Sequence, residues 1–589
     1  MKGKLLLSGG AMALAALGVS AERRSAEAVP FLPPVLTAQS LCGPDGIAKR
    51  QAYFLRMARA YAGDDEKKPA VASLRPDTIE PLARKITTEH EVAQEGFDLG
   101  LAYMIGFNHG EAIQAFRAAQ EADPGCAMCY WGEALALGPH INAQMPPEDG
   151  ERAYAALQEA ERLASGASEK ERQLIAALAT RYAQDPAAER APLDGAYADA
   201  MDRVARAYPE DDLIAVLAAE ANMDTQPWDY WAANGREPKG RTARTLELLE
   251  TVLARNPDYT PAIHLYIHAV EASTDPDRAA THADRLAELA TDLGHLVHMP
   301  THIYYRLGRW EQSLDRNIDA VAADEAYMAA TDVGDLYAYG YYPHNVHFAL
   351  TSAQMAGAKK DGMKMAEKLD AVVPIEMAAT IPLAQPIKAA PIFAVVQFGD
   401  PGAMLALEDP GDAAPLVKGA WHYARGEGYA RSGEPEKAMA EARKIAALAG
   451  RPETRALIEA DVPGPDILRI AELTVKARAH AAGGDYAAAI PLMEEAAELQ
   501  ESLPYMEPPY WYYPAKQTLA AMVLQAGEHE RAERLFLASL AESPNNAWAL
   551  AGLHETYKAS GDRAAARYAR ALFKEAWMGG RRGPDLEAL

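Results

Sequence analysis

The stretch from residue 93 to residue 124, AQEGFDLGLAYMIGFNHGEAIQAFRAAQEADP, decides the fold. Small residues at Gly100, Ala112 and Ala119 allow two antiparallel helices to approach each other closely. Phe116 fills the remaining space between them, and Pro124 closes the turn because proline does not continue a helix. The stretch therefore predicts a pair of antiparallel helices.

The same arrangement of small and bulky residues returns several times toward the C-terminus. The recurring positions are Gly426, Tyr429, Gly433 and Ala438; Gly484, Ala489, Met493 and Ala496; Gly527, Ala532, Phe536 and Pro544; and Gly561 and Ala566. Together with residues 93–124, these stretches resemble the tetratricopeptide repeat (TPR) family, whose unit has about 34 residues. The resemblance implies an all-α fold, in which antiparallel helix pairs stack in a right-handed superhelix, an α-solenoid.

The repeats divide the chain into regions. We expect an irregular N-terminal extension over 22–89, tetratricopeptide-like repeats over 90–255, histidine-rich central repeats over 256–370, a degenerate repeat and loop over 371–416, and C-terminal repeats over 417–589. A tyrosine-rich insertion over 325–343 interrupts the central repeats, and such insertions often border a binding face. Several runs, including Phe107-Asn108-His109 and Tyr342-Pro343-His344, resemble a group of exported bacterial repeat proteins, which implies no particular activity.

The first residues indicate export. Lys2 and Lys4 precede an apolar run from Leu5 to Leu17, and Val19-Ser20-Ala21 forms a small-residue cleavage site. This order is typical of a signal peptide over residues 1–21, cleaved after about Ala21, so we expect a periplasmic or secreted protein. No later apolar stretch reaches the roughly 20 residues that a membrane span needs.

Charge and motifs exclude several functions. The formal net charge of −25 makes a nucleic-acid partner improbable, because phosphate binding needs an excess of lysine and arginine. The phosphate-binding Gly-Lys loop, the Gly-x-Ser-x-Gly elbow and the His-Glu-x-x-His motif do not occur. The only cysteines are Cys42, Cys126 and Cys129, and two of them should pair in an oxidising compartment. For Cys126-x-x-Cys129, a structural disulfide or a pair of buried thiols is favoured over a redox role.

A histidine pair recurs at the repeat interval. His264 and His268 are followed, 34 residues later, by His298 and His302, so equivalent points of neighbouring repeats carry imidazoles. Three further histidines of this region are His295, His344 and His347. In the tetratricopeptide family the first helix of each pair lines a concave groove, so the resemblance implies that all seven point toward a ligand.

This spacing predicts a metal centre. Packed helices lie roughly 8–10 Å apart, so imidazoles on two adjacent helices can meet at one ion, with bonds of about 2.0–2.1 Å. We expect one ion between the two pairs, and a second reached by His295, His344 and His347. Imidazole ligands suit copper, zinc or iron, and copper fits an exported protein best. Glu271 and Tyr305 are the candidate catalytic residues, for oxidation or hydrolysis of a small molecule.

Two other interpretations stay open. The histidines and tyrosines could form a hydrogen-bonded layer that recognises a peptide or an anionic ligand. The chain could also be a non-catalytic scaffold that binds a peptide or a partner protein in its groove. The run Pro504-Tyr-Met-Glu-Pro-Pro-Tyr-Trp-Tyr-Tyr-Pro514 could cover one end of that groove, dock a partner, or fill a hydrophobic space between repeats.

Overall fold

The computed structural model describes residues 82–589, except 186, 233–234, 332, 334–335, 582 and 586–588. The expected signal peptide, most of the N-terminal extension and Cys42 lie outside the described residues. Residues 83–89, at the end of that extension, contain no helix. No helix among the described residues is both long and apolar enough to cross a membrane.

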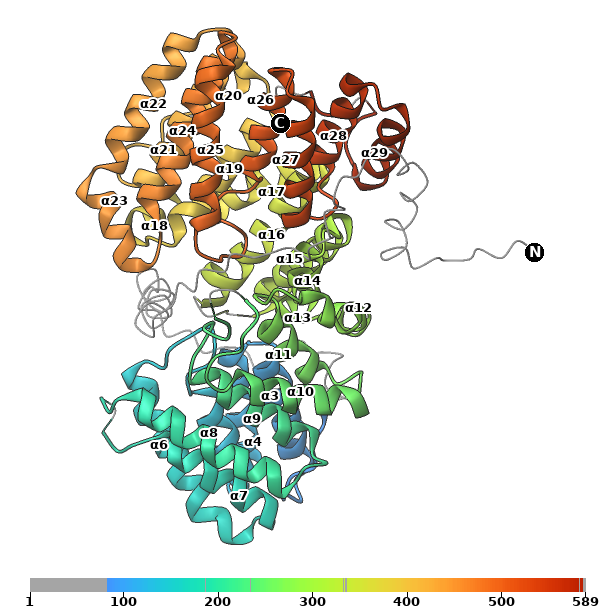
Figure 1. Cartoon of the computed structure of the whole chain (residues 1–589). Coiled ribbons are helices and arrows are strands. Elements are labelled where there is room, and N and C mark those ends of the chain that lie inside the picture. Colours follow the sequence, from blue (N-terminus) through green and yellow to red (C-terminus); the bar gives the residue numbers. More distant parts are fainter. Residues whose placement is uncertain are drawn as a thin grey trace. The chain divides into compact units, whose positions relative to one another are not determined.

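The described chain is built of helices packed in antiparallel pairs (Figure 1). No β-strand occurs in the described part, apart from isolated bridges such as His140–Ala143. The predicted all-α, tetratricopeptide-type solenoid is therefore confirmed. Its first half contains α3 (Glu91–Ile105), α4 (His109–Ala122), α5 (Ala127–Ala136), α6 (Pro147–Leu163), α7 (Glu169–Leu178), α8 (Arg190–Ala207), α9 (Asp212–Asp224) and α10 (Thr242–Arg255).

The predicted helix pair is α3 with α4, and its packing depends on Phe116. A Cβ atom added to Gly100 would lie 2.7 Å from the Phe116 ring, and one added to Gly132 of α5 would lie 2.4 Å from it. The ring therefore occupies the space that the glycines leave open. Cys126 and Cys129 form a disulfide at the start of α5, and both are fully buried, which favours a structural role.

The C-terminal helices use the same packing of a phenylalanine ring against a glycine. Phe536 of α27 lies 2.2 Å from the position that a Cβ atom on Gly552 of α28 would take. The helices of this half are α21 (Pro415–Arg431), α22 (Pro435–Ala449), α23 (Pro452–Ala456), α24 (Gly464–Ala482), α25 (Tyr486–Ser502), α26 (Ala515–Gln525), α27 (His529–Glu542), α28 (Ala547–Ser560) and α29 (Arg563–Ala576).

The central helices depart from the regular repeat. Their order is α11 (Thr260–Val270), α12 (Ala280–Leu289), α13 (Gly294–His298), α14 (Pro300–Arg306), α15 (Trp310–Ala330), a π-helix (Tyr337–Tyr341), α16 (Tyr342–Ala356) and α17 (Lys359–Val372). The expected insertion thus extends α15 and supplies the π-helix before α16. Residues 371–416 contain α18 (Ile375–Thr380), α19 (Ala384–Phe398) and α20 (Pro401–Leu405), followed by a loop.

Candidate metal centre

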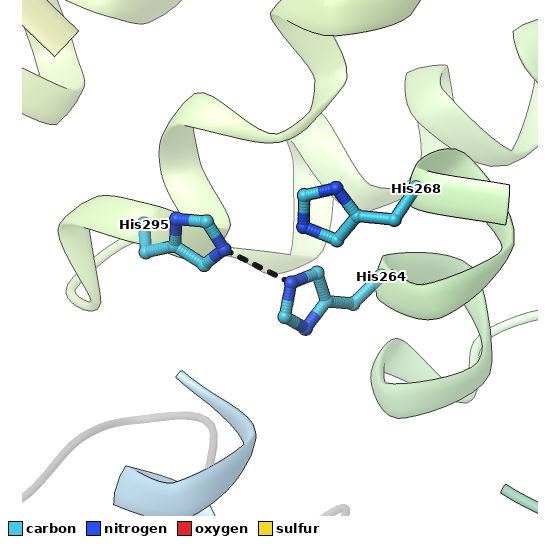
Figure 2. A group of neighbouring side chains, drawn as sticks. All are labelled: His264, His268 and His295. Carbon is cyan, nitrogen blue, oxygen red and sulfur yellow. Dashed lines mark hydrogen bonds between the residues drawn. The ribbon is translucent and has the colours of Figure 1, made fainter. Parts of the chain in front are cut away.

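The first histidine group consists of His264 and His268 on α11 and His295 on α13 (Figure 2). The Nε2 atoms of His264 and His295 are 3.0 Å apart. One ring nitrogen of each histidine lies within 4.8 Å of the others, and the three side chains are 1–3% exposed. Three buried imidazoles from two helices therefore converge on one point.

Hydrogen bonds orient the rings of the first histidine group. His268 Nδ1 lies 3.0 Å from Glu271 Oε1, and the Ile105 carbonyl accepts a hydrogen bond from the His264 ring. His268 Nε2 is buried without a hydrogen-bond partner among the described residues. Buried polar atoms nearly always have partners. A nitrogen that keeps its lone pair and has no partner is a vacant ligand atom.

The second histidine group consists of His298 on α13, His302 on α14 and His344 on α16. The Nε2 atoms of His298 and His302 are 2.8 Å apart. The His344 ring centre lies 4.8 Å from that of His298 and 5.6 Å from that of His302. These three residues also offer ligand atoms within 4.8 Å of one another.

Asn317 fixes the ring of His298. Its amide nitrogen donates to the Ser313 carbonyl at 2.7 Å, so its Oδ1 faces His298 Nδ1 at 2.6 Å and accepts that proton. The lone pair of His298 then lies on Nε2, toward His302. An outer partner that fixes the tautomer in this way accompanies most metal-bound histidines.

Glu271 and Glu507, here called the carboxylate pair, both contact His302 Nδ1. Glu271 Oε2 lies 2.5 Å from this nitrogen, and Glu507 forms a short ion pair with it. Because Glu271 Oε1 also contacts His268, this one carboxylate orients a ring in each histidine group. Glu507 arrives from the segment between α25 and α26, 205 residues after His302.

The two groups differ in their protonation. Burial keeps the pKa values of all three histidines of the first group well below the usual value, and the imidazole neighbours add to this effect. His298 and His344 behave in the same way. Burial also opposes charge on His302, but the carboxylate pair outweighs it and raises the His302 pKa to about 10.

A phenylalanine lies against each histidine group. The Phe107 ring centre is 4.6 Å from that of His264, 4.8 Å from that of His295 and 6.1 Å from that of His268. The Phe348 ring centre is 5.0 Å from that of His298, 4.9 Å from that of His302 and 5.0 Å from that of His344. Each group therefore has an apolar wall.

The remaining predicted residues fall around these groups. His347 lies outside both, because its Nε2 contacts the Tyr512 hydroxyl at 2.9 Å. Tyr305 packs against Phe348 and Trp310, behind the second group. The expected open groove is not found at this place, because the histidines of both groups except the half-buried His344 are at most 3% exposed.

Sequence reasoning missed the residues that complete the centre, namely Asn317, Phe107, Phe348 and Glu507. Glu507 lies within the proline-rich run 504–514, whose aromatic residues Tyr510 to Tyr513 are buried between repeats. No local pattern links this run to His302. His109 and His140 stack on each other with ring centres 4.2 Å apart, and both also contact Phe107.

No family model matches the chain, and no curated protein matches it. Solved structures with similar helix arrangements include human IFIT1 bound to m7Gppp-AAAA, at 12% identity and a TM-score of 0.29, covering 85% of this chain and 93% of that one. Yeast Tom70 matches at 13% identity and a TM-score of 0.26, covering 82% and 92%. The P58(IPK) TPR domain matches at 12% identity and a TM-score of 0.20, covering 80% and 99%.

Proposed function

We propose that this protein binds two transition-metal ions, one in each histidine group. The observation that carries the proposal is the buried, unpartnered Nε2 of His268, which faces two further imidazoles. An ion with bonds of about 2.0–2.1 Å needs its ligand atoms about 3.3–3.5 Å apart. The closest nitrogen pairs, at 3.0 and 2.8 Å, need to open only slightly to accept one.

The ligand set selects the class of metal. Imidazole nitrogens suit copper, zinc and iron, whereas calcium and magnesium need oxygen ligands. Among the three, we propose copper first and then iron or zinc, in keeping with the expected export of the chain. Determining the N-terminal residue of the mature protein tests that export, and an N-terminus near residue 22 is the expected result.

Glu271 and Tyr305 take different places in this proposal. Glu271 contacts imidazoles of both groups, so its role is to orient ligands. Tyr305 contacts Phe348 and belongs to neither histidine group. Because the histidines are buried, any oxidation or hydrolysis at the two ions would need a substrate small enough to enter a buried site.

Elemental analysis of the purified full-length protein, followed by titration of the metal-free protein with copper and zinc salts, tests the proposal. We expect two equivalents of bound metal per chain. Protein that contains no metal and takes up none would contradict it.

The second candidate is a scaffold that binds a peptide or a protein partner. The observation that favours it is a cavity of about 540 Å³, lined by residues that include Arg84, Lys170, Tyr208 and Tyr259. This cavity does not include either histidine group, so the two candidates concern different surfaces. A chain without metal affinity would leave the scaffold as the better interpretation.

A further inference from the structure

The two phenylalanines distinguish this centre from a set of histidines open to water. Phe107 and Phe348 are 3% and 1% exposed, and each ring contacts all three imidazoles of its own group. Phe107 is held between α3 and α4 with a φ of 60°, a conformation that few residues other than glycine adopt. The backbone is therefore strained at Phe107, the residue that packs against the first group.

A phenylalanine wall restricts the coordination number. Zinc with three protein ligands keeps water or substrate as its fourth ligand, and divalent copper prefers four ligands near one plane. A water ligand would have to share the space beside the imidazoles with the benzyl ring, and that ring offers it no hydrogen-bond partner. Three-coordinate binding avoids both problems.

Charge favours a monovalent ion. The first group offers three neutral imidazoles, and one carboxylate, Glu271, contacts an outer ring nitrogen there, whereas both Glu271 and Glu507 contact His302 in the second group. The cost of burying an ion rises with the square of its charge, so a divalent ion costs about four times as much as a monovalent ion of the same size. The first group, which has a single carboxylate at its outer nitrogens, therefore discriminates against divalent ions more strongly than the second group, which has two.

We propose that both histidine groups bind monovalent copper in three-coordinate sites without water, and that Phe107 and Phe348 determine this selectivity. The inference rests on the proposed function, because it specifies the ion that the two groups hold.

Competition experiments under anaerobic conditions test it. The metal-free full-length protein is titrated with monovalent copper against a chromophoric chelator of known affinity, and separately with zinc. The wild type should bind two monovalent copper ions per chain and retain both in a hundredfold excess of zinc. In F107A and in F348A, the zinc affinity of one group should rise at least tenfold, because water can then complete a tetrahedral site.

Two controls separate selectivity from folding. F107L and F348L keep an apolar side chain and should retain the preference for monovalent copper. Phe393 is also buried among aromatic rings, but it contacts Tyr423, Trp511 and Tyr512 instead of the histidine groups. F393A should therefore leave both affinities unchanged.

X-ray absorption of the copper-loaded protein measures the coordination number directly. Three nitrogen ligands are expected for the wild type, and a fourth light ligand for copper in the F348A site after air oxidation. Preferred binding of four-coordinate zinc by the wild type, or unchanged selectivity in both alanine variants, would overturn this inference and leave the metal centre in place. Absence of binding for every metal would overturn the proposed function itself.

Discussion

The two histidine groups share a plan but differ in how the chain completes them. Each has three imidazoles and one phenylalanine wall. The first group takes its histidines and its carboxylate, Glu271, from residues 264–295. The second group also needs Glu507, which lies more than 200 residues away in sequence. The ligands and the carboxylate of the first group thus come from one repeat and its neighbour, and Phe107 of the N-terminal helices adds its wall. The second group depends on docking of the C-terminal helices.

The largest expected effect is the loss of a whole ion. In H298N/H302N two ligands of the second group disappear, so bound metal should fall from two equivalents to one. H264N/H268N should remove only the ion of the first group. Elemental analysis and titration measure both.

His422 provides the matched control for these variants. It is buried and its Nδ1 contacts Glu441 at 2.6 Å, but it belongs to neither group. H422N should therefore keep both ions. Loss of both ions in either double variant, with helicity retained, would contradict two separate sites and favour one shared centre.

The second largest expected effect is a different pH dependence of stability for histidines of the two groups. In metal-free protein, the folded pKa of His295 is well below its unfolded value of about 6.5. The stability that it contributes is present above pH 6.5 and is lost as the pH falls through the folded pKa. H295N should therefore reduce the acid-side loss of stability by about 1.4 kcal/mol per pH unit.

The contribution of His302 to stability changes with pH in the opposite direction. Its folded pKa of about 10 lies above the unfolded value, so its contribution is fully present below pH 6.5 and is lost as the pH rises toward 10. H302N should lower stability at pH 6 and leave the slope between pH 6 and pH 5 unchanged. Urea unfolding between pH 5 and pH 9 measures both slopes, and equal effects of H295N and H302N on the acid side would refute the assignment.

The sequence predicted the helix pairs, which follow from a 34-residue period. It also predicted one ion between the two His-x-x-x-His pairs, whereas the structure places each pair in a group of its own. The sequence did not predict how the histidines divide. His344 and His347 lie three residues apart on α16, and successive residues of a helix are turned by about 100°, so their side chains point about 60° apart. Only packing shows that His344 turns to His298, while His347 turns to Tyr512.

The sequence did not predict the role of Glu507 for a different reason. A carboxylate in a proline-rich loop has no helical period that would place it on a face. Its contact with His302 is set by how the C-terminal helices return to α14, and that depends on the sum of small rotations between repeats. The same holds for Phe107, which lies in the short connection between α3 and α4.

A smaller effect should distinguish the two members of the carboxylate pair. His302 is the histidine that Glu507 contacts, whereas Glu271 contacts both His268 and His302, and the two carboxyl groups also hydrogen-bond to each other. E507A should weaken only the second ion, by about 10–100-fold, which is the usual effect of losing an outer partner. E271A should weaken both ions. Titration resolves the two affinities.

E507Q supplies the control for the loss of Glu507. Its amide oxygen can still accept a proton from His302 Nδ1, so it should recover part of the lost affinity. Equal weakening of both ions in E507A would show that the two groups are coupled through Glu507 as well.

The smallest effect concerns the turn between α14 and α15, which receives the C-terminal helices. Gly308 there has a φ of 68°, and an added Cβ atom would lie 1.8 Å from the Pro544 carbonyl oxygen. The same carbonyl accepts a hydrogen bond from Trp310, and Asn545 donates to the Gly308 carbonyl at 3.2 Å. G308A should therefore disturb the docking that brings Glu507 to the second group.

G433A is the control that measures the cost of backbone strain without a change in docking. The φ of Gly433 is 73°, close to that of Gly308, but an added Cβ atom would meet nothing within 4 Å. G433A should cost about 1 kcal/mol for the left-handed backbone alone, and G308A about 1–3 kcal/mol more, because the contact must shift. Since docking serves only the second group, G308A should also weaken the second ion and spare the first. Equal losses of stability in the two variants, with both metal affinities unchanged, would show that the second group does not depend on the C-terminal helices.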